Sequence, residues 1–285
     1  MVREARQDSV LNTVRQIVKE VRHRFAPVSG GRYASISLDR AMDSKNIISS
    51  LFGARRALIG AIHTGGLPGT PNAAAGIGAI AEECAAEAQI YRAAGFHGVI
   101  IENTHDRPYL KGSVGPEIAA ALAVIGYSVR RASGLPMGVQ VLAAANQCAL
   151  AVAHACGACF VRVEGFVFAH VADEGLIESS AGELLRYRRA IGAGDVRLFA
   201  DIKKKHSAHA ITADVDLPET ARAAEFFLAD GVIVTGVSTG QPADPHEVRA
   251  VSQAVKLPTL VGSGVTAENI RDYADADAFI VGSSV

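Results

Sequence analysis

The chain has 285 residues, of which 49% are hydrophobic and 20% charged, with 28 glycines and a formal net charge of −1 at pH 7. This composition is typical of a globular protein and excludes a disordered chain. The near-zero charge argues against nucleic acid as a partner, because proteins bind that polyanion mainly through an excess of Lys and Arg.

Residues 1–46 are interpreted as an N-terminal extension. Apolar residues recur at helical spacing from Val10 to Val21, which predicts an amphipathic helix that packs against the rest of the chain or against a neighbouring subunit. This unpartnered apolar face is our reason to expect a homo-oligomer. Residues 26–46 contain Pro and several Gly and are expected to be a linker.

From residue 57 onward, short β-branched runs alternate with Ala-rich helical segments, which is the pattern of successive βα units. Eight such units over residues 47–285 predict a closed (β/α)8 barrel, a TIM barrel, with an open doubly wound sheet as the alternative. The strands are expected at 57–62, 98–102, 137–142, 159–163, 197–203, 231–235, 258–262 and 277–281, and the helices near 76–94, 116–132, 146–156, 182–191, 217–229, 244–255 and 266–273.

One long uncharged stretch of the chain is compatible in length with a membrane span. Residues 132–161 contain no Asp, Glu, Lys or Arg, but Pro136, Gly138 and Asn146 interrupt the stretch, so we predict a buried strand, helix and strand rather than a membrane span.

The sequence ends at Val285, directly after the eighth strand, so the eighth outer helix is absent from the given chain. Either the chain continues further or the N-terminal helix covers that gap.

Ligands of such barrels bind at the carboxyl ends of the strands, so polar residues there are candidate site residues. The fifth predicted strand is the most informative, because alternation places Asp201, Lys203 and Lys205 on one face. Lys203 could hold an anionic substrate or act as a base or Schiff-base nucleophile, whereas the structural alternative is a buried Asp201–Lys203 ion pair. Other candidates at the strand ends and in the following loops are His63, Glu102, Asn103, Asp106, Glu164, Asp173, His206 and Thr235.

Glycine-rich turns follow the last two strands, where barrels commonly bind phosphate through backbone N–H groups. We therefore predict a phosphate site formed by Gly262, Ser263, Gly264, Gly282 and Ser283. A divalent metal held by Glu102, Glu164 and Asp201 is kept as an alternative, although no recognised zinc spacing is present.

The segments ALIGAIHTGGLPGTP, IENTHDRPY, GVQVLAAAN, RVEGFVFAHVADEG and DIKKKHSAHAITAD, among others over about residues 55–285, resemble the BtpA/SgcQ family. The resemblance implies the barrel fold and a cytoplasmic setting. It also implies a link to photosystem I stabilisation in photosynthetic members and to sugar or nucleoside metabolism in bacterial ones. Residues 1–45 extend beyond the usual start of that family, and its segment after the eighth strand is missing here.

We expect an isomerase, lyase or hydrolase that acts on a phosphorylated sugar or nucleoside-derived metabolite. Glu102, Asp201 and Lys203 would transfer protons, and His63 and His206 would orient or polarise the substrate. Asn103, Asp106, Glu164, Asp173, Lys205 and Thr235 would bind it. The alternative is a non-catalytic assembly or stabilising factor of the photosystem I biogenesis type.

Overall fold

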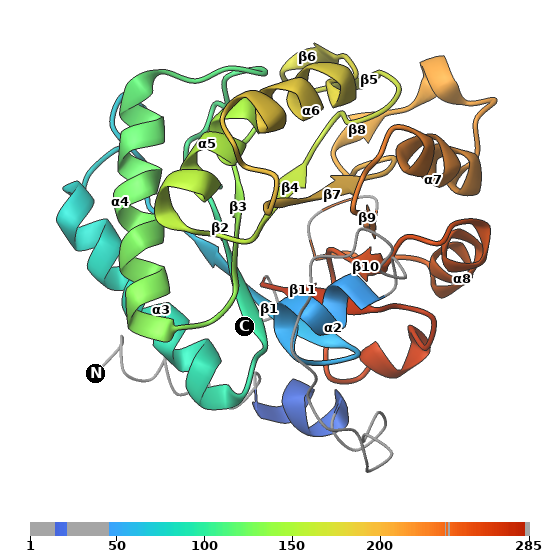
Figure 1. Ribbon diagram of the computed structural model, residues 1–285, viewed down its shortest axis with the longest axis horizontal. Helices are drawn as coiled ribbons and strands as arrows, with labels where there is room; N and C mark the ends of the chain where they lie inside the picture. The colour runs from blue at the N-terminus through green and yellow to red at the C-terminus, as the bar shows by residue number, and fades with distance from the viewer. Residues whose placement is uncertain (1–14, 22–45, 237, 239, 283–285) are drawn as a thin grey trace.

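A computed structural model describes residues 15–21, 46–236, 238 and 240–282 of the protein. Eight parallel strands close into a barrel in the order β1-β2-β3-β4-β7-β9-β10-β11, with β11 paired to β1 (Figure 1). The TIM-barrel prediction is therefore confirmed and the open sheet is ruled out. The barrel strands are β1 Ala57–His63, β2 Gly98–Glu102, β3 Met137–Gln140, β4 Phe160–Val163, β7 Arg197–Asp201, β9 Gly231–Val234, β10 Thr259–Val261 and β11 Ala278–Val281.

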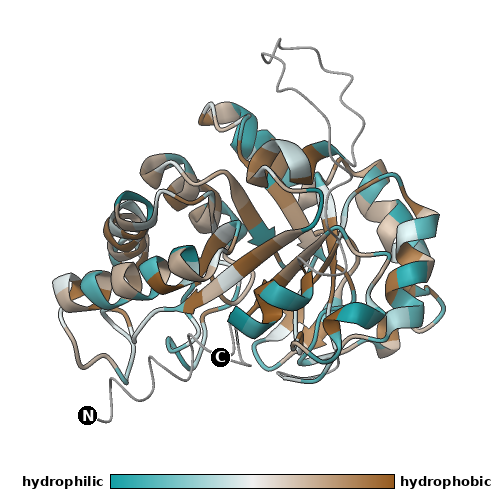
Figure 2. Ribbon diagram, turned by 90° about the horizontal axis from the view of Figure 1, so that it is seen from below, coloured by the Kyte–Doolittle hydropathy of each residue, from teal (hydrophilic) through white to brown (hydrophobic). Residues whose placement is uncertain are grey.

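The outer helices lie around the strands (Figure 2), and their buried apolar residues belong to the main hydrophobic core. They are α3 Ile77–Ala94, α4 Pro116–Ser133, α5 Asn146–Cys156, α6 Ala181–Ala190, α7 Leu217–Phe226 and α8 Pro245–Ala254. The helix expected at 266–273 is wrong, because only a 3₁₀ turn, η2 Ile270–Asp272, forms there. Side-chain hydrogen bonds explain this: Asn269 accepts from the Thr266 N–H and donates to the Gly264 carbonyl, which competes with helical pairing.

A short helix that the sequence analysis did not predict, α2 Asn46–Phe52, packs into one end of the barrel. Ile48 and Phe52 are buried among inward-facing strand residues, and the Phe52 and Phe160 ring centroids lie 5.8 Å apart. This helix closes the amino-terminal end of the barrel, since it leads directly into the start of β1. Residues 22–45, which include most of the expected linker, lie outside the described residues.

Residues 15–21 are helical, and Ile17, Val18 and Val21 are buried in the main hydrophobic core of the barrel. Glu20 forms an ion pair of 3.6 Å with Arg271, beside η2. The described part of the apolar face that led us to expect a homo-oligomer is thus covered by its own chain, and the homo-oligomer stays a prediction. The described residues end at Gly282, and within them no outer helix follows β11.

A second, antiparallel sheet joins the loops after β4 and β7, and the sequence analysis did not predict it. Its strands are β5 His170–Ala172, β6 Gly175–Ile177 and β8 Ser207–Ala208, in the order β6-β5-β8. Val171 of β5 lies opposite Leu176 on one side and Ala208 on the other. Since both parent loops leave the carboxyl ends of barrel strands, this sheet ties together two sides of the mouth where ligands are expected.

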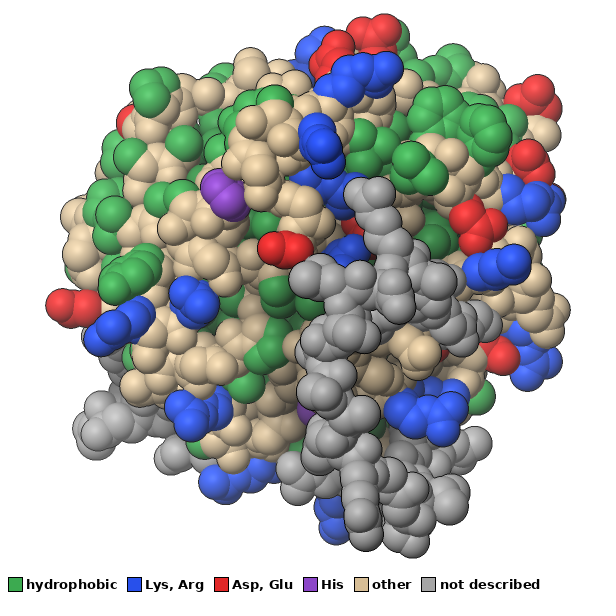
Figure 3. All heavy atoms as spheres, in the orientation of Figure 1, with side chains coloured by type: hydrophobic (Ala, Val, Ile, Leu, Met, Phe, Trp, Pro, Cys, Tyr) green, Lys and Arg blue, Asp and Glu red, His purple; other side chains and the backbone are tan. Residues whose placement is uncertain are grey.

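The uncharged stretch is divided among several elements of the barrel, as predicted. Residues 132–161 run through the end of α4, then β3, α5 and the first half of β4. None of the described helices is both long and apolar enough to cross a bilayer. Figure 3 shows acidic and basic side chains interspersed over one face of the molecule, with no broad patch of a single sign there.

Candidate functional site

The carboxyl ends of the eight strands form a ring of residues inside the barrel mouth. Alternate residues of a strand point to the same face, so each apolar residue of the barrel interior predicts an inward-facing residue two positions later. The interior residues include Ala61, Ile100, Phe160, Phe199, Ile233, Leu260 and Ile280. The residues two positions further on are His63, Glu102, Arg162, Asp201, Thr235, Gly262 and Gly282. Together with Gln140 of β3, they are called the polar ring below.

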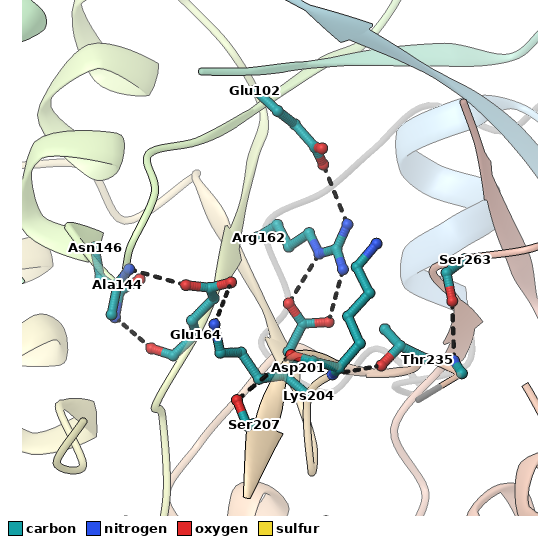
Figure 4. Close-up of polar contacts among 12 residues, drawn as sticks. Glu102, Ala144, Asn146, Arg162, Glu164, Asp201, Lys204, Ser207, Thr235 and Ser263 are labelled. Carbon is teal, nitrogen blue, oxygen red and sulfur yellow. Dashed lines mark hydrogen bonds and ion pairs between the residues drawn. The ribbon is translucent and has the colours of Figure 1, made fainter. Parts of the chain in front are cut away.

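Arg162 is the centre of this ring, and it lies between two carboxylates (Figure 4). Its Nε and Nη2 donate to the two carboxylate oxygens of Asp201 at 2.9 and 3.1 Å, and its Nη1 donates to Glu102 Oε1 at 3.1 Å. All three residues are buried, with relative exposures of 4–7%. Such bidentate pairing fixes the guanidinium plane, which makes the cluster a rigid support for the mouth.

The electrostatics of the ring follow from these pairs. Burial opposes ionisation of Glu102, but Arg162 and a hydrogen bond with His63 outweigh it and lower the pKa of Glu102 to about 2. In turn, the hydrogen bond to Glu102 raises the pKa of His63, although burial acts in the opposite direction. The His63 Nε2 and Glu102 Oε2 atoms lie 3.6 Å apart. Glu102 is therefore ionised at neutral pH and favours a protonated His63.

Two cavities open on the ring, and they share Glu102, Arg162 and Lys205. The smaller has a volume of about 30 Å³ and the larger about 330 Å³. The small cavity is completed by His63, Gly262, Ser263, Gly264, Val265 and Gly282, among others. The large cavity is completed by Thr104, Arg107, Tyr109, Gln140, Leu142, Glu164, Asp173, Glu174, Lys204 and His206.

The small cavity combines the glycines of the predicted phosphate site with cationic side chains. Gly264 adopts a left-handed conformation with φ +63°, and the backbone N–H groups of Ser263 and Gly264 make no hydrogen bond within the described part of the chain. The Ser263 hydroxyl accepts from the Gly236 N–H and donates to the Gln241 carbonyl, so it fixes the neighbouring loop. Ser283, the last residue predicted for this site, lies outside the described residues.

The large cavity is lined by a second buried ion pair. Glu164 Oε1 accepts from Lys204 Nζ at 3.1 Å, and Glu164 Oε2 accepts from the Ala144 N–H at 3.0 Å (Figure 4). Burial raises the pKa of Glu164, although Lys204 counteracts it. Asp173 and His206 also line this cavity, which is where the sequence analysis expected site residues.

The structural alternative of a buried Asp201–Lys203 ion pair is wrong, and so is the prediction that the two side chains lie on one face of a strand. Asp201 is bound by Arg162, while Lys203 Nζ donates to the Thr212 carbonyl at 3.0 Å. The alternation that placed Lys203 beside Asp201 fails because β7 ends at Asp201 and Lys203 adopts a positive φ of +45°. Asp201 and Lys203 line a separate small cavity between the loops after β4 and β7, and Lys205 takes the place predicted for Lys203.

Three residues predicted to bind substrate instead hold loops in place. Asn103 donates to Asp106 at 3.0 Å and accepts from the Leu142 N–H at 2.7 Å. The second oxygen of Asp106 accepts from the Leu67 N–H. Thr235 Oγ1 accepts from the N–H of Lys205 at 3.1 Å. Since their polar groups are occupied and they line neither cavity, their role is to position the loops of the mouth.

The alternative metal site is not supported by the arrangement of its three carboxylates. Arg162 lies between Glu102 and Asp201 and supplies the positive charge there, and Lys204 does the same for Glu164. Among the described residues, no three His, Cys, Asp or Glu side chains converge as ion ligands. These carboxylates are thus engaged by cations of the chain itself.

Arg162, Gln140 and Lys204 are among the site residues that the sequence analysis missed. Arg162 had a usable signal, because a charged residue two positions after Phe160 in an apolar strand must point into the barrel. Gln140 follows the same rule from Gly138. Lys204 had no such signal, since it lies beyond the end of β7, where alternation no longer applies.

Comparison with known proteins agrees with the motif-based resemblance. The model of the BtpA family matches residues 54–285. An uncharacterized mitochondrial protein of Caenorhabditis elegans is 44% identical over 85% of this chain and 90% of the relative. The photosystem I biogenesis protein BtpA of Synechocystis is 34% identical over 80% of this chain and 79% of the relative.

Among solved structures, a Burkholderia cenocepacia protein provisionally assigned as a phosphonomutase superposes with a TM-score of 0.54 at 16% identity. The match covers 85% of this chain and 93% of that one. A provisionally assigned lyase/mutase of the same organism gives a TM-score of 0.51 at 13% identity. At such low identity these likenesses support the barrel fold alone. The family match and the sequence relatives show more: the chain belongs to the BtpA family.

Proposed function

We propose that this protein is an enzyme that acts by acid/base chemistry on a small phosphorylated metabolite, either a sugar phosphate or a nucleoside-derived phosphate. One observation carries the proposal: the small cavity and the large cavity share Glu102, Arg162 and Lys205. A phosphate bound among the glycines would therefore leave the rest of its molecule beside the ionisable groups of the large cavity.

The small cavity has the chemistry of an anion site. Glu102 and Asp201 balance the charge of Arg162, so the positive charge that this cavity offers an anion comes from Lys205, and His63 adds a second when it is protonated. Backbone N–H groups in glycine-rich turns bind phosphate oxygens in many barrels. Gly262 also keeps the cavity open, because a Cβ there would lie 2.5 Å from Ile233 Cγ2 and 3.4 Å from Arg162 Nη2.

The large cavity supplies the groups that move protons. Glu164 is a candidate acid or base, because its raised pKa brings it closer to neutral pH. Glu102 has a pKa of about 2 and stays ionised, so it positions Arg162 and His63 rather than donating a proton. Asp201 lies behind Arg162 and lines neither of the two cavities, which makes it a positioning residue as well.

The size of the large cavity limits the substrate. Its volume of about 330 Å³ falls at the lower end of the range of about 300–1,000 Å³ that ligand sites occupy. Its lining includes carboxylates, cations and the phenol of Tyr109. These groups suit a substrate that carries hydroxyl groups better than one with an aliphatic chain. Isomerisation or aldol-type cleavage beside a carbonyl fits such groups, and so does hydrolysis.

A thermal-shift experiment followed by activity measurements tests the proposal. Ribose 5-phosphate and AMP are compared with unphosphorylated ribose and adenosine, and we expect the phosphorylated compounds alone to raise the melting temperature. Once a turned-over compound is found, Glu164→Gln and Lys205→Met should lose activity. Lys256→Met is the control, since Lys256 precedes β10 and lies at the opposite end of the barrel. Absence of any shift with a broad panel of phosphorylated metabolites would overturn the proposal.

The relative named photosystem I biogenesis protein favours a second candidate, a non-catalytic assembly or stabilising factor. A factor of this kind would have no need for ionisable groups desolvated beside a cavity. If a protein partner raises the melting temperature and no small molecule does, this second candidate replaces the first.

A further inference from the structure

Three consecutive lysines follow β7, and the structure gives each a different environment. Lys203 donates its ammonium to the Thr212 carbonyl, and Lys204 forms the ion pair with Glu164. Within the described part of the chain, no hydrogen bond or ion pair engages the Lys205 ammonium. Lys205 is also the lysine that lines both cavities of the mouth. The three side chains are therefore not interchangeable.

The backbone of Lys205 is fixed while its side chain is left for a ligand. Its N–H donates to Thr235 Oγ1 at 3.1 Å, which anchors the loop to the end of β9. The carboxylates that could otherwise neutralise its ammonium are occupied, because Glu102 and Asp201 bind Arg162 and Glu164 binds Lys204. A long cationic side chain held in this way projects to the junction between the anion site and the large cavity.

We propose that Lys205 is a catalytic nucleophile that forms an imine with a carbonyl carbon of the phosphorylated substrate. This inference rests on the proposed function and narrows it to substrates with an aldehyde or ketone group. The phosphate would lie in the glycine-lined small cavity, and the carbonyl would lie at the junction, where the amine can reach it. A nucleophilic lysine is typically desolvated and close to another cation, and here Arg162 is that cation.

The chemistry balances with the groups present. The neutral amine of Lys205 attacks the carbonyl carbon, and the nitrogen loses a proton as the oxygen gains one, which gives a carbinolamine. His63, which lines the same small cavity, can donate its proton to the hydroxyl, which leaves as water; the product is the protonated imine, an iminium ion that carries the positive charge His63 gave up. Burial, followed by the charge of Arg162, lowers the pKa of Lys205, which increases the fraction of neutral amine available for attack.

Reductive trapping tests this inference on the full chain. Ribose 5-phosphate and dihydroxyacetone phosphate are each mixed with the protein and sodium borohydride, which reduces an imine to a stable secondary amine. We expect a covalent adduct with the mass of the compound less one oxygen atom, located on Lys205 by peptide mass spectrometry. Inorganic phosphate should compete with trapping, and unphosphorylated ribose and dihydroxyacetone should not label Lys205.

Substitution of single lysines by arginine separates imine formation by the Lys205 amine from binding of the phosphate by its positive charge. Lys205→Arg keeps a cation beside the anion site, so it should retain the thermal shift with the phosphorylated compounds but lose the adduct. Lys203→Arg is the matched control and should still be labelled at Lys205, because Lys203 lines neither of the two cavities. A thermal shift without any Lys205 adduct would overturn the imine and leave the proposed function standing. Labelling spread over surface lysines, unchanged in Lys205→Arg, would overturn the imine as well, and absence of both shift and adduct would overturn both proposals.

Discussion

The strand ends of the barrel divide into two halves with opposite chemistry. At β10 and β11 the polar ring holds Gly262 and Gly282, and both glycines line the small cavity. At β2, β4 and β7 it holds Glu102, Arg162 and Asp201, whose charged groups bind one another. The glycine half offers space and backbone donors, whereas the charged half offers fixed side chains. The glycine half therefore depends on the absence of Cβ atoms, and the charged half depends on the pairing of charges.

The charged half should be the more sensitive of the two to mutation. Arg162→Met removes the cation that Glu102 and Asp201 share, and it leaves two buried carboxylates without compensation. We expect a loss of about 3–5 kcal/mol in the free energy of unfolding, measured by urea denaturation. Arg249→Met is the matched control, because Arg249 and Asp275 form an exposed pair whose loss should cost about 1 kcal/mol or less. Equal losses in the two variants would contradict the central role given to Arg162.

The glycine half should respond to added volume rather than to lost charge. In Gly262→Ala the new methyl group would lie 2.5 Å from Ile233 Cγ2 and 3.2 Å from Thr235 Cγ2, so neighbouring side chains must shift. We expect a loss of about 1–3 kcal/mol in the free energy of unfolding, as for other overpacked sites. Weaker binding of phosphorylated compounds in the thermal-shift experiment should accompany it. Gly194→Ala, where no heavy atom lies within 4 Å of the added Cβ, should change stability by about 0.5 kcal/mol or less.

The two halves also differ in how well the sequence predicts them. The glycine turns were located correctly, because they follow two apolar strands whose ends are easy to recognise. On the charged side, Glu102 was located at the mouth for the same reason. The error concerns Lys203, which follows the end of β7 and lines neither of the two cavities. Positive φ angles at Lys203 and His206 change the direction of the chain there, and no glycine in the sequence indicates such turns.

The sequence also failed to predict the elements that lie outside the repeating βα units. Helix α2 and the sheet of β5, β6 and β8 were not predicted, since each is short and is stabilised by contacts with distant parts of the chain. Phe52 illustrates this, because its burial depends on Phe160 more than 100 residues away in the sequence. Local periodicity predicts the regular strands and helices, but it gives little information about segments whose structure is determined by tertiary packing.

The smallest expected effect lies where the two halves meet, at His63. This residue lines the glycine-rich cavity and is linked to Glu102 on the charged side, and the hydrogen bond to Glu102 raises the pKa of His63. In Glu102→Gln the negative charge is gone, so the pKa of His63 should fall. A pH titration of the His63 imidazole proton signals by NMR measures the change, and His246, an exposed residue of α8 that lines neither cavity, serves as the internal control.

The sign of the stability effect follows from the direction of this shift. Because the folded protein binds the His63 proton more tightly than the unfolded chain does, His63 stabilises the fold fully below the unfolded pKa of about 6.5. That contribution disappears as the pH rises through the higher pKa of the folded state. Unfolding measured at pH 6 and at pH 9 should therefore show the wild type losing this increment and Glu102→Gln losing less of it. An unchanged His63 titration in Glu102→Gln would mean that the two halves of the ring are electrostatically independent.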